Sequence, residues 1–276
     1  MRSPKELSLD TKIIDAVSAF GPTDPAAPGK LLEVTKKILR DEEMQGLQEY
    51  ANTVSIKRLG YNDHGPVHMR AVALNAVVMM GLLRKAGIRT SLETEECGSF
   101  EDSLIAMVLA ATLHDIGMSV SREDHELHSA YLACPILDRL LADAYPKDIL
   151  KRVMVRSLAL ECIYGHMGNH VIHSLEAGVI LMADGCDMTK GRARIPIAIS
   201  EHPKVGDIHK YSANSIEEVR ILPGKEKPIH VEILMSSEVG LFQVEEVLLG
   251  KIAASTAKNY IELYAIVKQG EPKRYL

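Results

Sequence analysis

The chain has 276 residues, a length that suits one large domain or one domain with an appendage. Hydrophobic residues make up 46% and charged residues 25%, which excludes a disordered or fibrous protein. The net charge is −5, so no basic field favours nucleic acid, and we expect no nucleic-acid partner. The longest apolar run, Ala71 to Leu83, is short for a membrane span, and the first residues do not resemble a secretory signal. We therefore expect a cytoplasmic protein without a membrane contact.

Residues 1–60 are expected to form short N-terminal helices that pack on the rest of the chain. The Pro/Gly-rich stretch from Gly21 to Gly29 predicts a loop between two of these helices. Apolar residues at helical spacing follow it from Leu31 to Leu39. No residue pattern in this region indicates chemistry.

Residues 61–195 are predicted to form a core of strong helices. Pro66 suits a first helical position, and Gly87 and Gly117 suit helix ends. Capping boxes are expected at Ser99 and at Ser121, each followed three residues later by an acidic residue. The expected helices, in chain order, are Pro66 to Gly87, Ser99 to Gly117, Ser121 to Leu141 with Pro135 inside, Lys147 to Tyr164, and Ser174 to Met188.

Residues 196–276 are expected to form a small α+β subdomain. Strands are predicted over Val219 to Leu222, Ile229 to Met235 and Tyr260 to Val267, with a helix over Val239 to Ala254. The predicted fold class is therefore mainly α, a helical bundle core with a small C-terminal α+β appendage. A homodimer is expected on base rates alone.

Histidine is the unusual residue of this chain, because eight of its 11 copies lie between His64 and His173. Residue types that bind metals gather at helix ends in four places: His64 and His68; His114 and Asp115; His125, His128 and His166; Asp184 and Asp187. Imidazole and carboxylate ligands without a suitably placed thiolate favour Mn, Fe, Ni, Zn, Co or Mg over a cysteine-zinc site. We expect one or two such ions.

The order of these residues resembles a known family. His68, then His114-Asp115, then Asp184, on successive helices, resembles the HD-domain superfamily of metal-dependent phosphohydrolases over residues 60–190. The segment that follows Asp187 resembles an uncharacterised archaeal and bacterial branch of that superfamily. The cyclic-di-GMP branch carries the strings His-His-Glu and Gly-Tyr-Pro, which this sequence lacks.

The resemblance implies roles for individual residues. One ion would be held by His68, His114, Asp115 and Asp184, and a second by Asp115, His125 and His166. His128, one turn after His125, is an alternative ligand. His64 resembles the proton donor of cyclic-nucleotide phosphodiesterases, although Tyr61 lies three residues before it and not next to it.

The implied activity is hydrolysis of a phosphate ester, on a nucleotide or another small phosphorylated molecule, by water that a metal activates. Asp115 and His64 would be catalytic, and Lys190, Arg192 and Arg194 would bind the phosphate. Those three cations are also typical of an ordinary helix C-terminus. Asp187 is expected to cap or solvate its helix end. The alternative function is a non-catalytic regulatory module that binds a metal or nucleotide through the core and the C-terminal subdomain.

Overall fold

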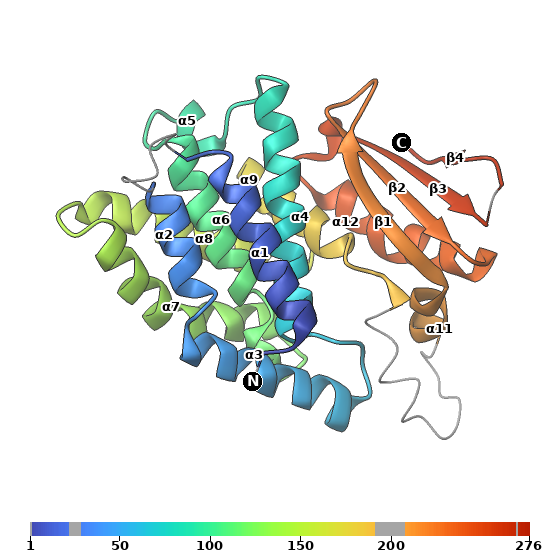
Figure 1. Cartoon of the computed structure of the whole chain (residues 1–276), viewed down its shortest axis with the longest axis horizontal. Helices are drawn as coiled ribbons and strands as arrows, with labels where there is room; N and C mark the ends of the chain where they lie inside the picture. Colours follow the sequence, from blue (N-terminus) through green and yellow to red (C-terminus); the bar gives the residue numbers. More distant parts are fainter. Residues whose placement is uncertain (1, 22–28, 191–207, 269) are drawn as a thin grey trace.

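The computed structural model describes residues 2–21, 29–190, 208–268 and 270–276. Helices fill the chain up to residue 190, and a small sheet follows residue 215, so the fold is mainly α with an α+β appendage, as predicted (Figure 1). The helical elements, in chain order, are α1 (Pro4–Ser18), α2 (Lys30–Ile38), α3 (Glu42–Thr53), η1 (Val54–Leu59), α4 (Pro66–Lys85), α5 (Ser91–Thr94), α6 (Phe100–Leu113), η2 (Ile116–Ser119), α7 (His125–Ala144), α8 (Ile149–Gly165) and α9 (Leu175–Gly185).

The centre of the helical part is formed by α4 and α6, which pack on each other. Almost every residue of α6 is buried, as expected for a helix that is apolar on all sides. Within the described residues, α4 is long and apolar enough to cross a membrane, but 72% of that window is buried inside the structure. The helix also carries the buried polar side chains of His68 and Arg70. We therefore interpret α4 as the core helix of the bundle.

The N-terminal helices are tied to this centre by a buried polar network. Arg70 of α4 is fully buried and donates to Asp10 of α1 at 2.7 Å and to Gln48 of α3 at 3.0 Å. Gln48 in turn donates to the carbonyl oxygen of Thr112 of α6 at 2.6 Å. Arg70 lies two residues after His68, and Thr112 lies two residues before His114. The network therefore holds the helix segments that carry both histidines.

Several predicted helix boundaries are confirmed. Ser99 forms a capping box with Asp102, whose N–H it accepts at 3.2 Å and whose carboxylate accepts the N–H of Ser99 at 2.9 Å. Gly87 has a φ of 76°, which explains why the preceding helix ends there. The helix α7 continues through Pro135.

The predicted boundaries at Gly117 and Ser121 are wrong. The helix α6 ends four residues before Gly117, which lies in η2. A Cβ on Gly117 would lie 2.0 Å from the carbonyl oxygen of His125, so this glycine permits a close approach instead of a helix stop. Its N–H donates to Ser129 at 2.8 Å, which fixes the start of α7 against η2. Because of this contact α7 begins at His125, after Asp124 with a φ of 52°, and the Ser121 hydroxyl accepts from the N–H of Glu123 at 3.1 Å and not from a helix N–H.

The C-terminal part is a four-stranded mixed sheet in the order β1 (Ile216–Pro223), β2 (Ile229–Met235), β3 (Ile261–Val267), β4 (Lys273–Arg274). The pairs β1/β2 and β3/β4 are antiparallel, whereas β2/β3 is parallel and therefore needs a crossover. The predicted helix over 239–254 is that crossover and is helical throughout, in the segments η3 (Glu238–Gly240), η4 (Gln243–Leu248) and α12 (Leu249–Ala254). Tyr260 belongs to η5 (Lys258–Tyr260), and α11 (Ile208–Ser215) precedes β1.

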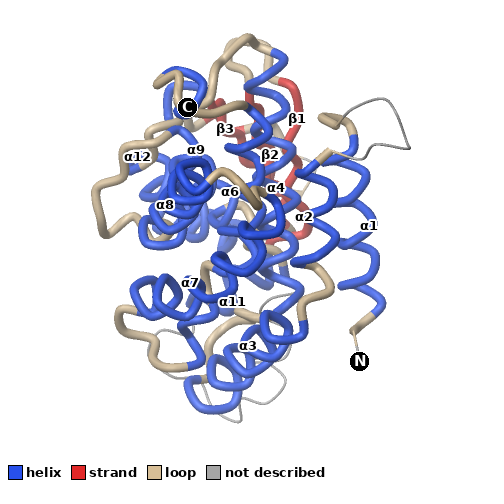
Figure 2. The backbone as a smooth tube through the Cα atoms, turned by 90° about the vertical axis from the view of Figure 1, so that its left-hand side faces the viewer, coloured by secondary structure: helices blue, strands red, loops and turns tan. Residues whose placement is uncertain are grey.

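The appendage is docked on the helical part through α9. A Cβ on Gly178 would lie 2.1 Å from the hydroxyl oxygen of Thr256, so the chain after α12 lies directly on the helix. Ser255 donates to the carbonyl oxygen of Gly178 at 2.9 Å, and Thr256 donates to that of Ser174 at 2.6 Å. Apolar side chains of both parts form one buried cluster. Figure 2 shows the strands packed beside the helices of the core.

Candidate metal centre

The six residues expected as metal ligands lie together in the structure. Each comes from the end of a helix: His68 from the first turn of α4, His114 and Asp115 from the residues after α6, His125 from the start of α7, His166 from the residue after α8, and Asp184 from the last turn of α9. Their exposed fractions range from 0% for His114 to 8% for Asp184. Distant segments of the chain thus converge on one buried polar cluster.

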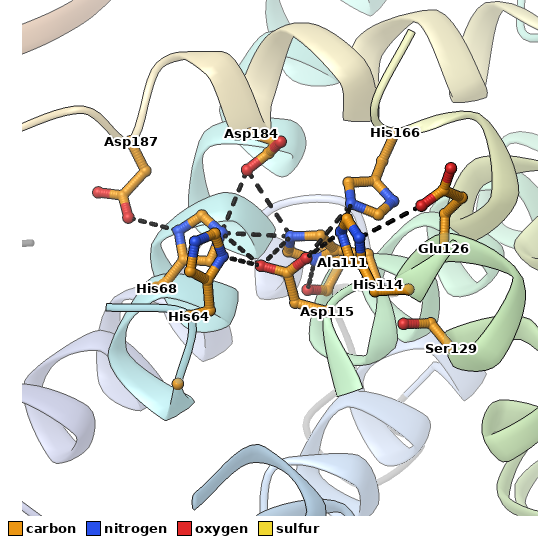
Figure 3. A network of polar contacts seen from close by, with 12 residues as sticks. His64, His68, Ala111, His114, Asp115, Glu126, Ser129, His166, Asp184 and Asp187 are labelled. Atoms are coloured by element: carbon orange, nitrogen blue, oxygen red, sulfur yellow. Dashed lines mark hydrogen bonds and ion pairs between the residues drawn. The ribbon is translucent and has the colours of Figure 1, made fainter. Parts of the chain in front are cut away.

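Asp115 lies at the centre of this cluster (Figure 3). Its Oδ2 atom is 3.3 Å from Nε2 of His68 and 3.5 Å from Nε2 of His114, which we call the first histidine pair. Its Oδ1 atom is 3.2 Å from Nε2 of His125 and 3.3 Å from Nε2 of His166, the second histidine pair. One carboxylate therefore presents one oxygen to each pair.

Asp184 adds a second carboxylate to the first pair only. Its Oδ1 atom lies 3.1 Å from Nε2 of His68 and 3.7 Å from Nε2 of His114. Two nitrogens and two carboxylate oxygens therefore surround the first position, whereas the second has two nitrogens and one oxygen of Asp115. This set of buried His and Asp side chains could hold a metal ion and is compatible with an HD-type site.

The four rings share one orientation. Each Nδ1 atom faces an acceptor: the Asp187 carboxylate for His68, and the carbonyl oxygens of Ala111, Arg122 and Ile163 for His114, His125 and His166. Because a carbonyl oxygen only accepts, Nδ1 carries the proton and Nε2 of the neutral ring has a lone pair. All four Nε2 lone pairs therefore point into the cluster.

These lone pairs face each other at short range. The two Nε2 atoms are 3.2 Å apart in the first pair and 3.2 Å apart in the second. Two acceptors at this distance repel unless a cation or a proton lies between them. Metal–nitrogen bonds of about 2.0–2.1 Å separate neighbouring ligand atoms by roughly 3–3.5 Å, so the spacing fits a divalent cation in each pair.

The charges of the cluster also suit a cation. Burial would raise the pKa of Asp115, but the neighbouring His114 and His64 hold it well below its usual range. Burial likewise opposes ionisation of Asp184, and the charge of Lys251 outweighs it, so the pKa of Asp184 is also well below its usual value. Burial lowers the pKa of His166 to about 4, which keeps this ring neutral and able to ligate at pH 7.

Several contacts of the cluster were not expected from the sequence. Asp187 was predicted to cap or solvate its helix end, but its Oδ2 accepts from Nδ1 of His68 at 2.7 Å, which fixes the tautomer of that ring. The three-residue spacing from Asp184 was the available signal. Lys251 of α12 forms an ion pair with Asp184 and donates to the carbonyl oxygen of His166 at 2.9 Å. No local pattern in the sequence marks this lysine.

The other candidate histidines lie at different distances from the centre. His64, expected to act as a proton donor, is partly exposed, and its Nδ1 is 2.7 Å from Oδ2 of Asp115. His128, the alternative to His125, is half-buried, whereas His125 is buried with its Nε2 atom 3.2 Å from Oδ1 of Asp115. His173 is exposed.

A cavity of about 150 Å³ opens beside the cluster and is lined in part by His64, Asp115, His166, Asp184 and Asp187. Two cationic side chains, Arg122 and Lys251, also line it. The predicted phosphate-binding residue Lys190 is exposed and is not among the lining residues. Arg192 and Arg194 lie outside the described residues.

Comparison with curated proteins finds an archaeal relative of the chain. No protein-family model matches the chain, and no solved structure matches it. The uncharacterized protein MJ1020 of Methanocaldococcus jannaschii is 45% identical over 236 residues, which cover 86% of this chain and 89% of that protein. The chain therefore belongs to the same family as the uncharacterized protein MJ1020.

Proposed function

We propose that the protein is a divalent-metal-dependent phosphohydrolase of the HD-domain type, which cleaves a phosphate ester of a nucleotide or another small molecule. The observation that carries this proposal is the position of Asp115 between two histidine pairs. In each pair the two Nε2 atoms are 3.2 Å apart. A carboxylate shared between two such pairs suits two ions held side by side, an arrangement common among phosphatases and nucleases.

The first ion would be held by His68, His114, Asp115 and Asp184, and the second by Asp115, His125 and His166. Such ions would polarise a phosphoryl group and lower the pKa of water toward neutrality. The chain itself supplies the cavity that admits the ester and the neutral rings that ligate. His166, with a pKa held at about 4 by burial, does not compete for protons at pH 7.

His64 is the residue best suited to protonate the leaving oxygen of the ester. It lines the cavity, is partly exposed, and contacts Asp115 through Nδ1 at 2.7 Å. The contact with a carboxylate orients the ring. A general acid must lie within about 3 Å of the leaving oxygen, and His64 lines the cavity that would hold the ester. Changing His64 to Gln should therefore lower kcat even when the metal centre is saturated.

The experiment that tests the proposal measures metal and turnover together. The purified full chain is loaded with Mn, Co, Ni or Mg, and its bound metal is determined by elemental analysis. Phosphate release is then measured against a panel of nucleotides and small phosphate esters. We expect bound metal and turnover in the wild type, and loss of both in the double variant His114→Ala, Asp115→Ala.

The exposed residue His173 provides the matched control, since His173→Ala removes an imidazole outside the cluster. It should retain metal and turnover. Unchanged turnover in the double variant would remove the proposal. Tight metal binding without phosphate release from any ester under any metal would favour the regulatory module instead.

A further inference from the structure

Lys251 is the feature of the site that the metal cluster alone does not explain. It comes from α12 of the C-terminal subdomain, yet it forms an ion pair with Asp184 and donates to the carbonyl oxygen of His166. A divalent ion in the first histidine pair would bind Oδ1 of Asp184 and leave Oδ2 against the ammonium group of Lys251. The charge of this carboxylate would then be shared between the ion and the lysine, so the ammonium group, which lines the cavity, would be only partly neutralised. A charge in such a place calls for an anion.

The placement of this lysine is fixed by the fold. A Cβ on Gly185, the residue after Asp184, would lie 3.2 Å from Cδ of Lys251, so the lysine stem packs directly on α9. The chain just after α12 is held by the hydrogen bonds from Ser255 and Thr256 to α9. The ammonium group is therefore presented by two docked helices and not by a mobile side chain on the surface.

The charges around the cavity also favour an anionic occupant. Among the described lining residues, Asp115, Asp184 and Asp187 are acidic, and Arg122 and Lys251 are basic, which leaves a net charge of −1 with neutral histidines. Two divalent cations would change this to +3. A phosphoryl dianion would bring the site near neutrality, and Lys251 and Arg122 would supply the donors that its free oxygens need.

The size of the cavity and one of its walls indicate a small polar occupant. Its volume of about 150 Å³ is the space of roughly five water molecules, below the ~300 Å³ of a pocket that encloses a whole drug-sized ligand. The side-chain oxygen of Asn62, which lines the cavity, is buried without a hydrogen-bond partner in the described structure. Because an amide oxygen accepts, it calls for a donor such as water or a substrate hydroxyl, and the phosphoryl oxygens would have to lie elsewhere in the cavity.

We propose that Lys251 binds the free oxygens of the substrate's terminal phosphoryl group, so that the C-terminal subdomain completes the active site and the substrates are phosphomonoesters. This inference rests on the proposed phosphohydrolase function. Arg122, whose guanidinium lies 3.1 Å from Nδ1 of His125, is the second cation available to the same group. The remainder of a larger substrate would lie outside the cavity.

The test uses inorganic phosphate as the probe, so it does not depend on turnover. Phosphate is titrated calorimetrically into the Mn-loaded full chain, for the wild type, Lys251→Met, Lys251→Arg and Lys258→Met. Lys258 is the matched control, an exposed lysine that does not line the cavity. We expect Lys251→Met to weaken phosphate binding about 10- to 100-fold, the loss of one charge-assisted contact. Lys251→Arg should restore most of the affinity, and Lys258→Met should not change it.

Bound Mn per chain and the unfolding temperature are measured in every variant. Equal phosphate affinity of Lys251→Met and the wild type at saturating Mn would overturn the inference. The inference would also be overturned if Lys251→Met lost Mn but kept its phosphate affinity, because the lysine would then act only on Asp184 and not on the phosphate. If phosphate binds through Lys251 but no ester is hydrolysed, the phosphate site stands and the hydrolase proposal fails. If phosphomonoesters and diesters are cleaved equally well, the assigned substrate class is wrong.

Discussion

The two histidine pairs present the same ligand atoms but are built differently. The first pair faces two carboxylates, Asp115 and Asp184, and a third, Asp187, fixes the ring of His68. In the second pair, Asp115 faces both Nε2 atoms, and both Nδ1 atoms face backbone carbonyls, although Nδ1 of His125 also lies 3.2 Å from Oε2 of Glu126. More negative charge around the same nitrogens binds a divalent cation more tightly. We therefore expect a tight first ion and a weaker second ion.

The supports behind the two pairs differ as well. Behind the first pair lies the buried network of Arg70, Asp10 and Gln48, which joins three helices. Behind the second pair lies the close approach of η2 to α7 at Gly117. The first pair is supported by charged hydrogen bonds. The second pair is supported by a glycine, whose missing side chain lets η2 lie against α7. This difference allows each half of the centre to be changed separately.

The largest effect is expected for Asp115→Asn, because this carboxylate is shared by both pairs. The amide keeps the shape but removes the charge and one acceptor oxygen. Affinity for both ions should fall by more than about 100-fold, since even a residue that only supports a ligand contributes up to that much. The measurement is a Mn titration with the bound metal counted per chain. Asp143→Asn, an exposed aspartate paired with Lys37, is the control. Retention of one ion at wild-type affinity would show that Asp115 serves a single pair.

The second-largest effect is expected to differ between the two histidine pairs. His114→Ala removes a ligand of the first pair, and His166→Ala removes one of the second. We expect His166→Ala to keep one tightly bound ion and His114→Ala to lose it, because the first position has two carboxylates and the second has one. A competition titration with a chelator gives both affinities, and His173→Ala is the control. Equal losses in the two variants would mean that the charge difference between the pairs does not set the order of binding.

The resemblance to the HD-domain superfamily led us to expect these six residues together, and local signals mark the helix ends that carry some of them. Pro66 marks the helix start before His68, and the apolar helix before His114 ends at the ligands. The sequence does not predict contacts between residues that lie far apart along the chain. Lys251 and Arg122 reach the cavity only through the docking of α12 on α9 and the turn before α7. No local pattern encodes such a contact.

Errors in the predicted elements have the same cause. Ser121 has the residues of a capping box, but the contact of Gly117 with Ser129 fixes the start of α7 four residues later. Local propensity is a weak preference, and a tertiary contact of this kind outweighs it. The helix predicted over 239–254 is present and forms the crossover between two parallel strands, with the π-helical segment η4 inside it.

A moderate effect is expected for Gly117→Ala, which should weaken the second ion while the first ion stays bound. The added Cβ would lie 2.0 Å from the carbonyl oxygen of His125, so the start of α7 must shift and carry that ring away from Asp115. The same titration measures both ions. Gly46→Ala is the control, since a Cβ there meets nothing within 4 Å and alanine suits a helix. If Gly117→Ala weakened the first ion as strongly, the two pairs would not be separately supported.

The smallest effect is expected for Asp187→Asn, which acts on the first ion through His68. Asn still accepts from Nδ1 through its side-chain oxygen, so the ring keeps its orientation but loses the nearby charge that raises its basicity. The affinity of the first ion should fall by about 10- to 100-fold, and that of the second should not change. Asp187→Ala, which removes the acceptor as well, should cost more than Asp187→Asn. If Asp187→Ala and Asp187→Asn lowered the affinity of the first ion equally, the hydrogen bond would add nothing beyond the charge of Asp187. The orientation of the His68 ring would then not depend on this acceptor.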